Sequence, residues 1–306
     1  MQGLYRDGIL EEQPDDKCYQ LVLNLWTKSN KDNAGQRAEA ILRELIASGT
    51  NGSAPALVNA STYQQVMKSY RNQPGRAMAL LHEMFGLYSQ GKRNCKPTED
   101  AFWSVLQGLS GGRSPEEAHQ FLLQMGQLYQ SGRLDTAKPT KRAYNLVLQR
   151  WAKSKSQKAG ERAEFLLRAM QTQYLDHGDR SVQPTTEEYK WVLTSMSKTA
   201  KRVADVEAMF QELFGAYCST GKQKSNLKPD TACVNALFVA CRSTGEAERV
   251  ESILSQIEEW NDKGILNTRP TIISYNLVLA CLASAGLAPE AAVSYTHLTL
   301  PTKVTV

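Results

Sequence analysis

Apolar residues recur along this chain with the spacing of an amphipathic helix, and similar stretches return several times. Three of them begin at an aromatic residue and read Tyr19-Gln-Leu-Val-Leu-Asn-Leu-Trp26, Tyr144-Asn-Leu-Val-Leu-Gln-Arg-Trp151 and Tyr275-Asn-Leu-Val-Leu-Ala-Cys-Leu282. Apolar residues fall at the first position and three, four and seven positions later, which is one face of a helix. A polar or glycine-containing break and a second apolar run follow, as in residues 37–42 and 162–167. The pattern therefore predicts pairs of helices.

A proline marks the start of most of these pairs. An anchor residue follows five positions after each of six prolines, and a looser seventh copy has its anchor eight positions after Pro55. The seven anchors are Tyr19, Tyr63, Phe102, Tyr144, Tyr189, Val234 and Tyr275, separated by 44, 39, 42, 45, 45 and 41 residues. Proline suits the first turn of a helix, and a glycine closes the second helix, as at Gly91, Gly132 and Gly178. The period predicts an all-α solenoid of about seven helix-turn-helix repeats.

The ends of the chain depart from this period. Residues 1–12 match the end of a second helix, because Met1 to Gly8 parallels Met84 to Gly91, so we expect the tail of a truncated preceding repeat. Residues 13–293 form the repeat array. Residues 294–306 are rich in Thr and β-prone residues and match no repeat end, and we expect them to be an artefact derived from sequencing adapter.

Composition and motifs exclude several classes of protein. Lys plus Arg is 36 and Asp plus Glu is 31, which gives 36 − 31 = +5 and permits a polyanionic partner without requiring one. No apolar run has the length of a membrane span, and the six cysteines lack metal or redox spacing. No catalytic constellation is present in these residues. We therefore expect no enzyme activity in this chain, no cofactor, no metal, no membrane and no small-molecule substrate.

The repeat itself resembles a known family. A unit with Lys-Pro-Thr or Lys-Pro-Asp, then Tyr-Asn-x-Val-Leu, Ala-x-x-Leu and a closing Gly resembles the pentatricopeptide repeat, in a variety with a long period. The best copies start at Lys138, Lys228 and Arg269. The resemblance implies a right-handed superhelix that binds single-stranded RNA in organellar RNA processing, stability or translation, in a mitochondrion or plastid. A targeting segment can be neither seen nor excluded, because we expect the chain to begin inside a repeat.

The same resemblance implies which residues read the RNA bases. One set directly follows the anchors, and Asn there offers a donor and an acceptor to a base edge. The candidates in this set are Gln20, Gln64, Asn145, Asn235 and Asn276, whereas Trp103 and Lys190 take the same position and suit it poorly. The other set lies four residues before each anchor: Asn59, Thr98, Thr140, Thr185, Asp230 and Thr271.

Two other features leave the function open. Lys28, Lys153 and Lys198 each follow an anchor by nine residues, which suits either phosphate contacts or helix ends stabilised by the dipole. Two residues before each anchor the family prefers an apolar residue, but only Ile273 fits among Lys17, Ser61, Asp100, Arg142, Glu187, Ala232 and Ile273. The polar residues at these positions favour the alternative of a protein-binding helical scaffold. The third alternative is a ribonuclease whose catalytic part lies outside this sequence.

Overall fold

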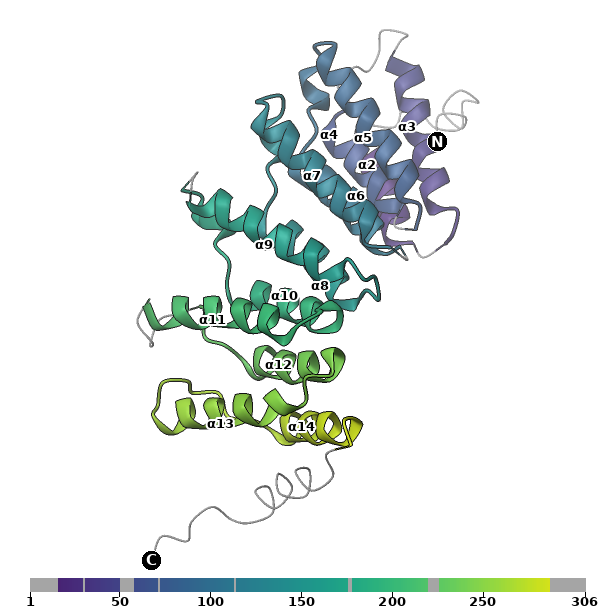
Figure 1. The fold of residues 1–306 in the computed structure, drawn as a ribbon. Coiled ribbons are helices and arrows are strands. Elements are labelled where there is room, and N and C mark those ends of the chain that lie inside the picture. The colour runs from purple at the N-terminus through teal and green to yellow at the C-terminus, as the bar shows by residue number, and fades with distance from the viewer. Residues whose placement is uncertain are drawn as a thin grey trace, which may run out of the picture. The chain divides into compact units, whose positions relative to one another are not determined.

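The computed structural model describes residues 16–29, 31–49, 58–70, 72–112, 114–175, 178–219 and 226–286 (Figure 1). Within these ranges the chain forms 13 α-helices and no strand, so the all-α prediction is confirmed. The α-helices are α2 (Asp16–Lys28), α3 (Ala34–Gly49), α4 (Ala60–Ser69), α5 (Pro74–Ser89), α6 (Glu99–Ser110), α7 (Glu116–Gln130), α8 (Lys141–Lys153), α9 (Ala159–Leu175), α10 (Thr186–Thr199), α11 (Val203–Ser219), α12 (Thr231–Thr244), α13 (Glu248–Asp262) and α14 (Ile272–Ser284). The predicted end segments 1–12 and 294–306 lie outside the described residues.

The helices alternate between two roles. Each anchor lies on a first helix, and these are α2, α4, α6, α8, α10, α12 and α14. The second helices of the repeats are α3, α5, α7, α9, α11 and α13. Short 3₁₀ helices precede three of the first helices: η1 (Arg93–Cys95), η2 (Asp135–Ala137) and η3 (Arg180–Val182). The order of elements along the chain is the one that the period predicts.

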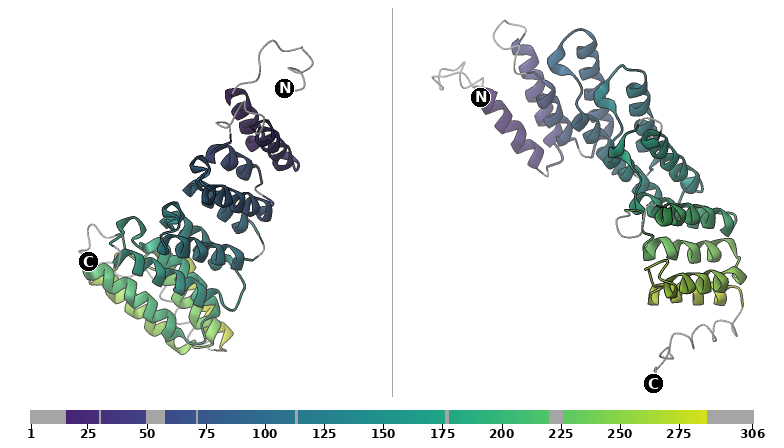
Figure 2. Two further views of the ribbon diagram at one scale, coloured as in Figure 1. Left: turned by 90° about the horizontal axis from the view of Figure 1, so that it is seen from above. Right: turned by 90° about the vertical axis from the view of Figure 1, so that its left-hand side faces the viewer.

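The chain divides into two compact units at Pro139 and Thr140. In unit 1, α2 packs against α4 and α4 against α6, while α3 and α5 each pack against the first helices on both sides of them in sequence. Unit 2 repeats this plan, with α8, α10, α12 and α14 in contact in that order and α9, α11 and α13 packed on them (Figure 2). Each unit is therefore a helical repeat stack, or α-solenoid.

The anchors are core residues. Tyr63 is fully buried, and Phe102, Tyr144, Tyr189 and Val234 are each no more than 6% exposed. The hydroxyls of Tyr63, Tyr144 and Tyr189 donate to a side chain on the second helix of the same repeat, at 2.6, 3.3 and 2.8 Å. Tyr275 instead donates to Glu258 on α13 of the preceding repeat at 2.7 Å. A buried phenol needs such a partner, so these anchors join first and second helices.

Glycines have two separate roles in this packing. Gly91, Gly132 and Gly178 have φ of 92°, 67° and 63°, which confirms the predicted left-handed stops after the second helices. Gly160 serves a close approach instead, because a Cβ there would lie 2.5 Å from Thr199 Oγ1 and 3.1 Å from Met196 Cα. The absence of a side chain at Gly160 lets α9 contact the end of α10.

Candidate nucleic-acid interface

The residue after each anchor lies on a first helix, at the surface of the layer that these helices form. Gln20 and Asn276 are exposed, and Gln64, Asn145 and Asn235 are half-buried. The next first helix packs beside the one that carries the residue, as α10 lies beside α8 and α14 beside α12. Residues at this position therefore lie on helices that border the junction between successive repeats.

Asn145 on α8 and Asn235 on α12 share an unusual environment. The amide oxygen Oδ1 of each is buried and has no hydrogen-bond partner among the described residues. Leaving such an oxygen unpaired costs about 1–3 kcal/mol, and the two ends of an amide exchange places when the side chain flips. Gln65 on α4, two residues after its anchor, also has a buried oxygen without a partner. Among the predicted base readers in the described part of the chain, Asn145 and Asn235 are the two with such an oxygen.

Gln64 on α4 shows which group such a residue meets in the next repeat. Its Nε2 donates to Asp100 Oδ2 at 2.6 Å, and Asp100 lies two residues before the following anchor. The amide nitrogen of Gln64 is thus already paired within unit 1. Its role in reading a base stays a prediction.

The second predicted set has a common structural position that the sequence reasoning missed. All six residues are N-caps of first helices: Asn59, Thr98, Thr140, Thr185, Asp230 and Thr271. Asn59 accepts from Thr62 N at 3.1 Å, Thr98 from Ala101 N at 3.2 Å and Asp230 from Cys233 N at 2.8 Å. Asn, Asp and Thr are the preferred N-cap types, which is the signal that would have found this role.

Thr185 is held more tightly than the other caps. Glu188 Oε2 accepts from both its N and its Oγ1 at 2.6 Å, and Lys141 Nζ at the start of α8 donates to the same hydroxyl at 3.3 Å. Glu188 is fully buried, and its other oxygen lies 3.4 Å from the Lys141 ammonium. This cluster joins the beginnings of α8 and α10, so the cap of repeat five also fixes its junction with repeat four.

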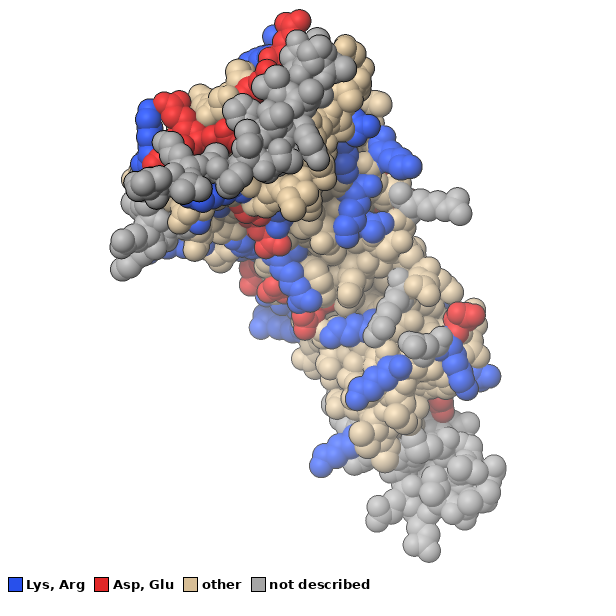
Figure 3. Space-filling model, turned by 90° about the horizontal axis from the view of Figure 1, so that it is seen from below, with Lys and Arg blue, Asp and Glu red and all other residues tan. Residues whose placement is uncertain are grey.

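The three repeated lysines all lie in the last turns of first helices. Lys28 and Lys153 are exposed. Lys198 Nζ donates to Ala152 O at 2.6 Å, near the end of the neighbouring helix α8, which fits the helix-end interpretation at this position. On the face that Figure 3 shows, Lys and Arg side chains are interrupted by uncharged surface and do not merge into one continuous basic area.

Other candidate chemistry is scarce in the described part of the chain. No group of three or more His, Cys, Asp or Glu side chains in it is placed to hold a metal ion. No helix among the described residues has both the length and the apolar character needed to cross a bilayer. Burial raises the pKa of the Cys241 thiol to about 12 and also raises that of Cys281, as expected of unreactive core thiols.

No family model matches the chain, and no curated protein matches it. Among solved structures, the chain is similar to the crystal structure of the pentatricopeptide repeat protein PPR10 from maize, with 17% identity and a TM-score of 0.29. The match covers 94% of this chain and 54% of that one, so the chain spans about half of its length.

Proposed function

We propose that this chain is a pentatricopeptide-type repeat protein that binds single-stranded RNA along its first helices. In this proposal it acts without catalysis of its own, as an RNA-binding protein in organellar RNA processing, stability or translation. The helix pairs and the anchors have the arrangement that such a protein needs, and the recurring residues after the anchors supply one side chain per repeat. Reading by one or a few side chains per repeat is how repeat proteins recognise single-stranded bases.

The observation that carries this proposal is the pair of unused amides at Asn145 and Asn235. They occupy the same position in two repeats of unit 2, and both have a buried oxygen without a partner. A base edge that enters the junction would hydrogen-bond to the amide and remove the cost of leaving it unpaired. Neither oxygen makes a contact that holds the repeats together. A bound ligand therefore explains a polar side chain at this position better than the fold does.

The test is selection of RNA by the full chain from a random single-stranded pool, followed by affinity measurements against salt. We expect a recovered motif of about four to seven bases, on the estimate of about one base per repeat. Asn145→Ala and Asn235→Ala should each weaken binding about tenfold, which corresponds to about 1.4 kcal/mol for the lost hydrogen bonds. Each should relax the preference at a different base, and affinity should fall as salt rises.

The matched control is Gln256→Ala, which removes an exposed amide from the second helix α13. It should leave RNA affinity unchanged. If the two asparagine variants select the same motif with the same affinity as the parent chain, the base-reading role is wrong. If no sequence is enriched at all, the chain does not read RNA.

The alternative is a protein-binding helical scaffold, and one contact favours it. Gln64 and Asp100 satisfy each other across the junction of repeats two and three, so the amide that would read a base there is already used. A scaffold of this kind would show weak RNA retention that does not depend on sequence. The selection above distinguishes the two functions, because only base reading gives a motif that changes with the asparagine variants.

A further inference from the structure

A groove on unit 1 lies between the second helices α5 and α7. Its volume is about 510 Å³. Apolar side chains from three helices line it: Leu81 and Phe85 from α5, Phe102 from α6, and Phe121, Met125 and Leu128 from α7. Phe85 and Leu128 are half-buried and form the accessible part, while Phe102 and Phe121 are buried beneath them. The groove therefore offers apolar surface to a ligand.

The charged residues in and next to this groove are mostly basic. No Asp or Glu is among its lining residues, and the exposed side chain of Arg133 lies at its end beside Pro97. Two loop segments, 90–98 and 131–138, meet there, because Thr136 Oγ1 donates to Pro97 O at 2.6 Å and Lys96 Nζ lies 2.7 Å from Asp135. Together these segments carry five basic residues and one acidic residue. An apolar ligand with negative charge is complementary to this end.

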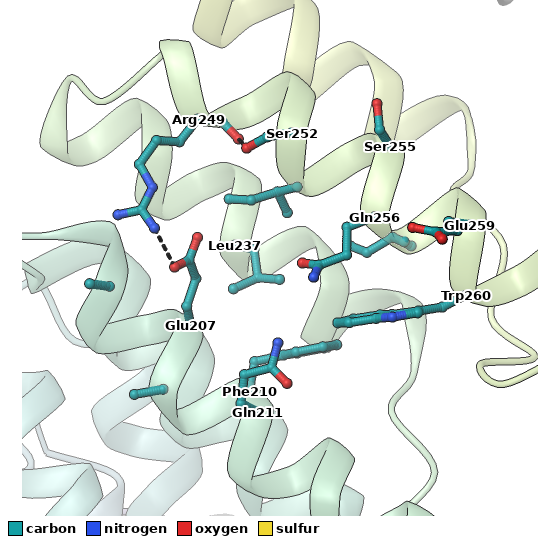
Figure 4. Close-up of a pocket in the computed structure, with 14 residues that line it drawn as sticks. Glu207, Phe210, Gln211, Leu237, Arg249, Ser252, Ser255, Gln256, Glu259 and Trp260 are labelled. Carbon is teal, nitrogen blue, oxygen red and sulfur yellow. Dashed lines mark hydrogen bonds and ion pairs between the residues drawn. The ribbon is translucent and has the colours of Figure 1, made fainter.

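A second groove with the same construction lies between α11 and α13 in unit 2 (Figure 4). It has a volume of about 790 Å³, and Trp260 takes the place of Leu128 in the repeat. Figure 4 shows Glu207 and Arg249 joined on its wall by an ion pair of 2.6 Å, and Glu259 also lines it. The two grooves lie at equivalent places in the repeat but differ in charge, since acidic side chains line only the one in unit 2. An acidic ligand would thus distinguish them.

We propose that the groove between α5 and α7 binds an acidic amphipathic helix of a partner protein. Large apolar side chains of that helix pack on Phe85 and Leu128, and its carboxylates lie toward Arg133 and the basic loop segments. Apolar anchors spaced along one face are the usual means by which a helix occupies a groove. RNA suits this surface less well, because Phe102 and Phe121 are only 3% and 5% exposed, which leaves Phe85 as the one accessible phenyl ring among the lining residues.

The probe is a labelled helical peptide with Leu and Phe at positions i, i+3, i+4 and i+7 and Glu elsewhere on its surface. A second peptide keeps the apolar residues and replaces every Glu by Lys. We expect the full chain to bind the acidic peptide at least tenfold more tightly, measured by fluorescence anisotropy, with affinity falling as salt rises. Equal binding of the two peptides would overturn the proposal.

Matched variants locate the binding. Gln124 and Gln256 are exposed and lie 22 residues after their anchors, in the grooves of units 1 and 2. Gln124→Glu and Arg133→Glu should each weaken binding of the acidic peptide about tenfold, whereas Gln256→Glu should leave its affinity unchanged. All three are surface substitutions, so far-ultraviolet circular dichroism and thermal unfolding should match those of the parent chain. An equal effect of Gln124→Glu and Gln256→Glu would refute the location.

The remaining question is whether the basic loops serve RNA instead. A single-stranded RNA recovered by the full chain is added as a competitor to the peptide complex. We expect it to leave the peptide bound and Arg133→Glu to leave RNA affinity unchanged, because the groove and the first-helix surface are separate. Displacement of the peptide, together with loss of RNA affinity in Arg133→Glu, would assign the groove end to RNA and overturn the proposal. This test holds whichever residues read the RNA, and where the chain selects no RNA the two peptides and the matched variants decide the proposal.

Discussion

Replacing Glu39 by Gln should destabilise unit 1 more than any other loss of one charge in that unit. Glu39 on α3 is 6% exposed and accepts hydrogen bonds from Arg76 Nη2 at 2.6 Å and from Tyr70 Oη at 2.6 Å. Arg43 Nη2 lies 3.1 Å away on the same helix. Tyr70 and Arg76 belong to the next repeat, so this one carboxylate joins repeats one and two. Removing its charge leaves the guanidinium groups of Arg43 and Arg76 without this anionic partner.

The expected loss of stability follows from the pKa of Glu39. Burial alone would raise this pKa, but the hydrogen bonds from Arg76, Tyr70 and Arg43 outweigh it and lower the pKa from 4.5 to about 2. A difference of about 2.5 pKa units corresponds to about 3 kcal/mol in favour of the ionised folded state. Because the pKa is depressed on folding, this stabilisation is present above about pH 4.5 and is lost as the pH falls to about 2.

The assay is urea unfolding of the parent chain and Glu39→Gln at several pH values, with hydrogen exchange of α3 and α5 as a local readout. At pH 7 the variant should be less stable by about 3 kcal/mol, and the difference should vanish as the pH approaches 2. Glu44→Gln changes an exposed side chain on the same helix and should cost less than about 0.5 kcal/mol. An equal stability of Glu39→Gln and the parent at pH 7 would refute the reasoning, as would a difference that does not depend on pH.

Three further predictions concern packing and thiol chemistry. Leu166→Ala, at a fully buried position on α9, should cost about 2–5 kcal/mol in urea unfolding, and a cost under 1 kcal/mol would contradict the core assignment. Gly160→Ala should cost about 1–3 kcal/mol and speed hydrogen exchange in α10, because its Cβ would overlap Thr199; unchanged exchange would show that the helices are not in close contact there. Iodoacetamide at pH 8 should label the exposed Cys218 well before the buried Cys241, as peptide mass spectrometry would show, and equal labelling rates would place Cys241 outside the core.

The fold could be predicted from the sequence because its signals are local and repeated. A proline, an anchor five residues later and a closing glycine recur with little change, and each acts on its own turn of the chain. The helix pairs and the left-handed glycines at Gly91 and Gly132 follow from these signals. One local signal was nevertheless overlooked. Thr98, Asp230 and the corresponding residues stand just before helices, where Thr and Asp serve as N-caps, so their position has a structural reason that does not depend on RNA.

The pairing of the candidate site residues was not predictable in the same way. Gln64 meets Asp100 across 36 residues, and Glu39 meets Arg76 across 37. Each of these contacts depends on how far one repeat is turned relative to the next, and that angle is set by packing along both helices rather than by any short motif. The packing angle between repeats also determines which contacts Asn145, Asn235 and Gln64 make. All three occupy the position after an anchor, and Gln64 donates to Asp100 of the following repeat. The position of Asp100 is taken by Glu187 in the repeat after Asn145 and by Ile273 in the repeat after Asn235, so the sequence alone does not tell which of these pairs forms.

Ion pairs between arginine and glutamate link neighbouring second helices in both units. Arg43, Arg168 and Arg249 all lie on second helices and pair with glutamates of the adjacent second helix, at 2.6, 2.7 and 2.6 Å. Such a pair does not fill the space between two second helices, because Arg249 and Glu207 lie on the wall of the groove between α11 and α13. Among the lining residues of the groove between α5 and α7 no acid is present. The two grooves therefore differ in charge rather than in being open or closed, and an acidic partner meets a carboxylate only in the groove of unit 2.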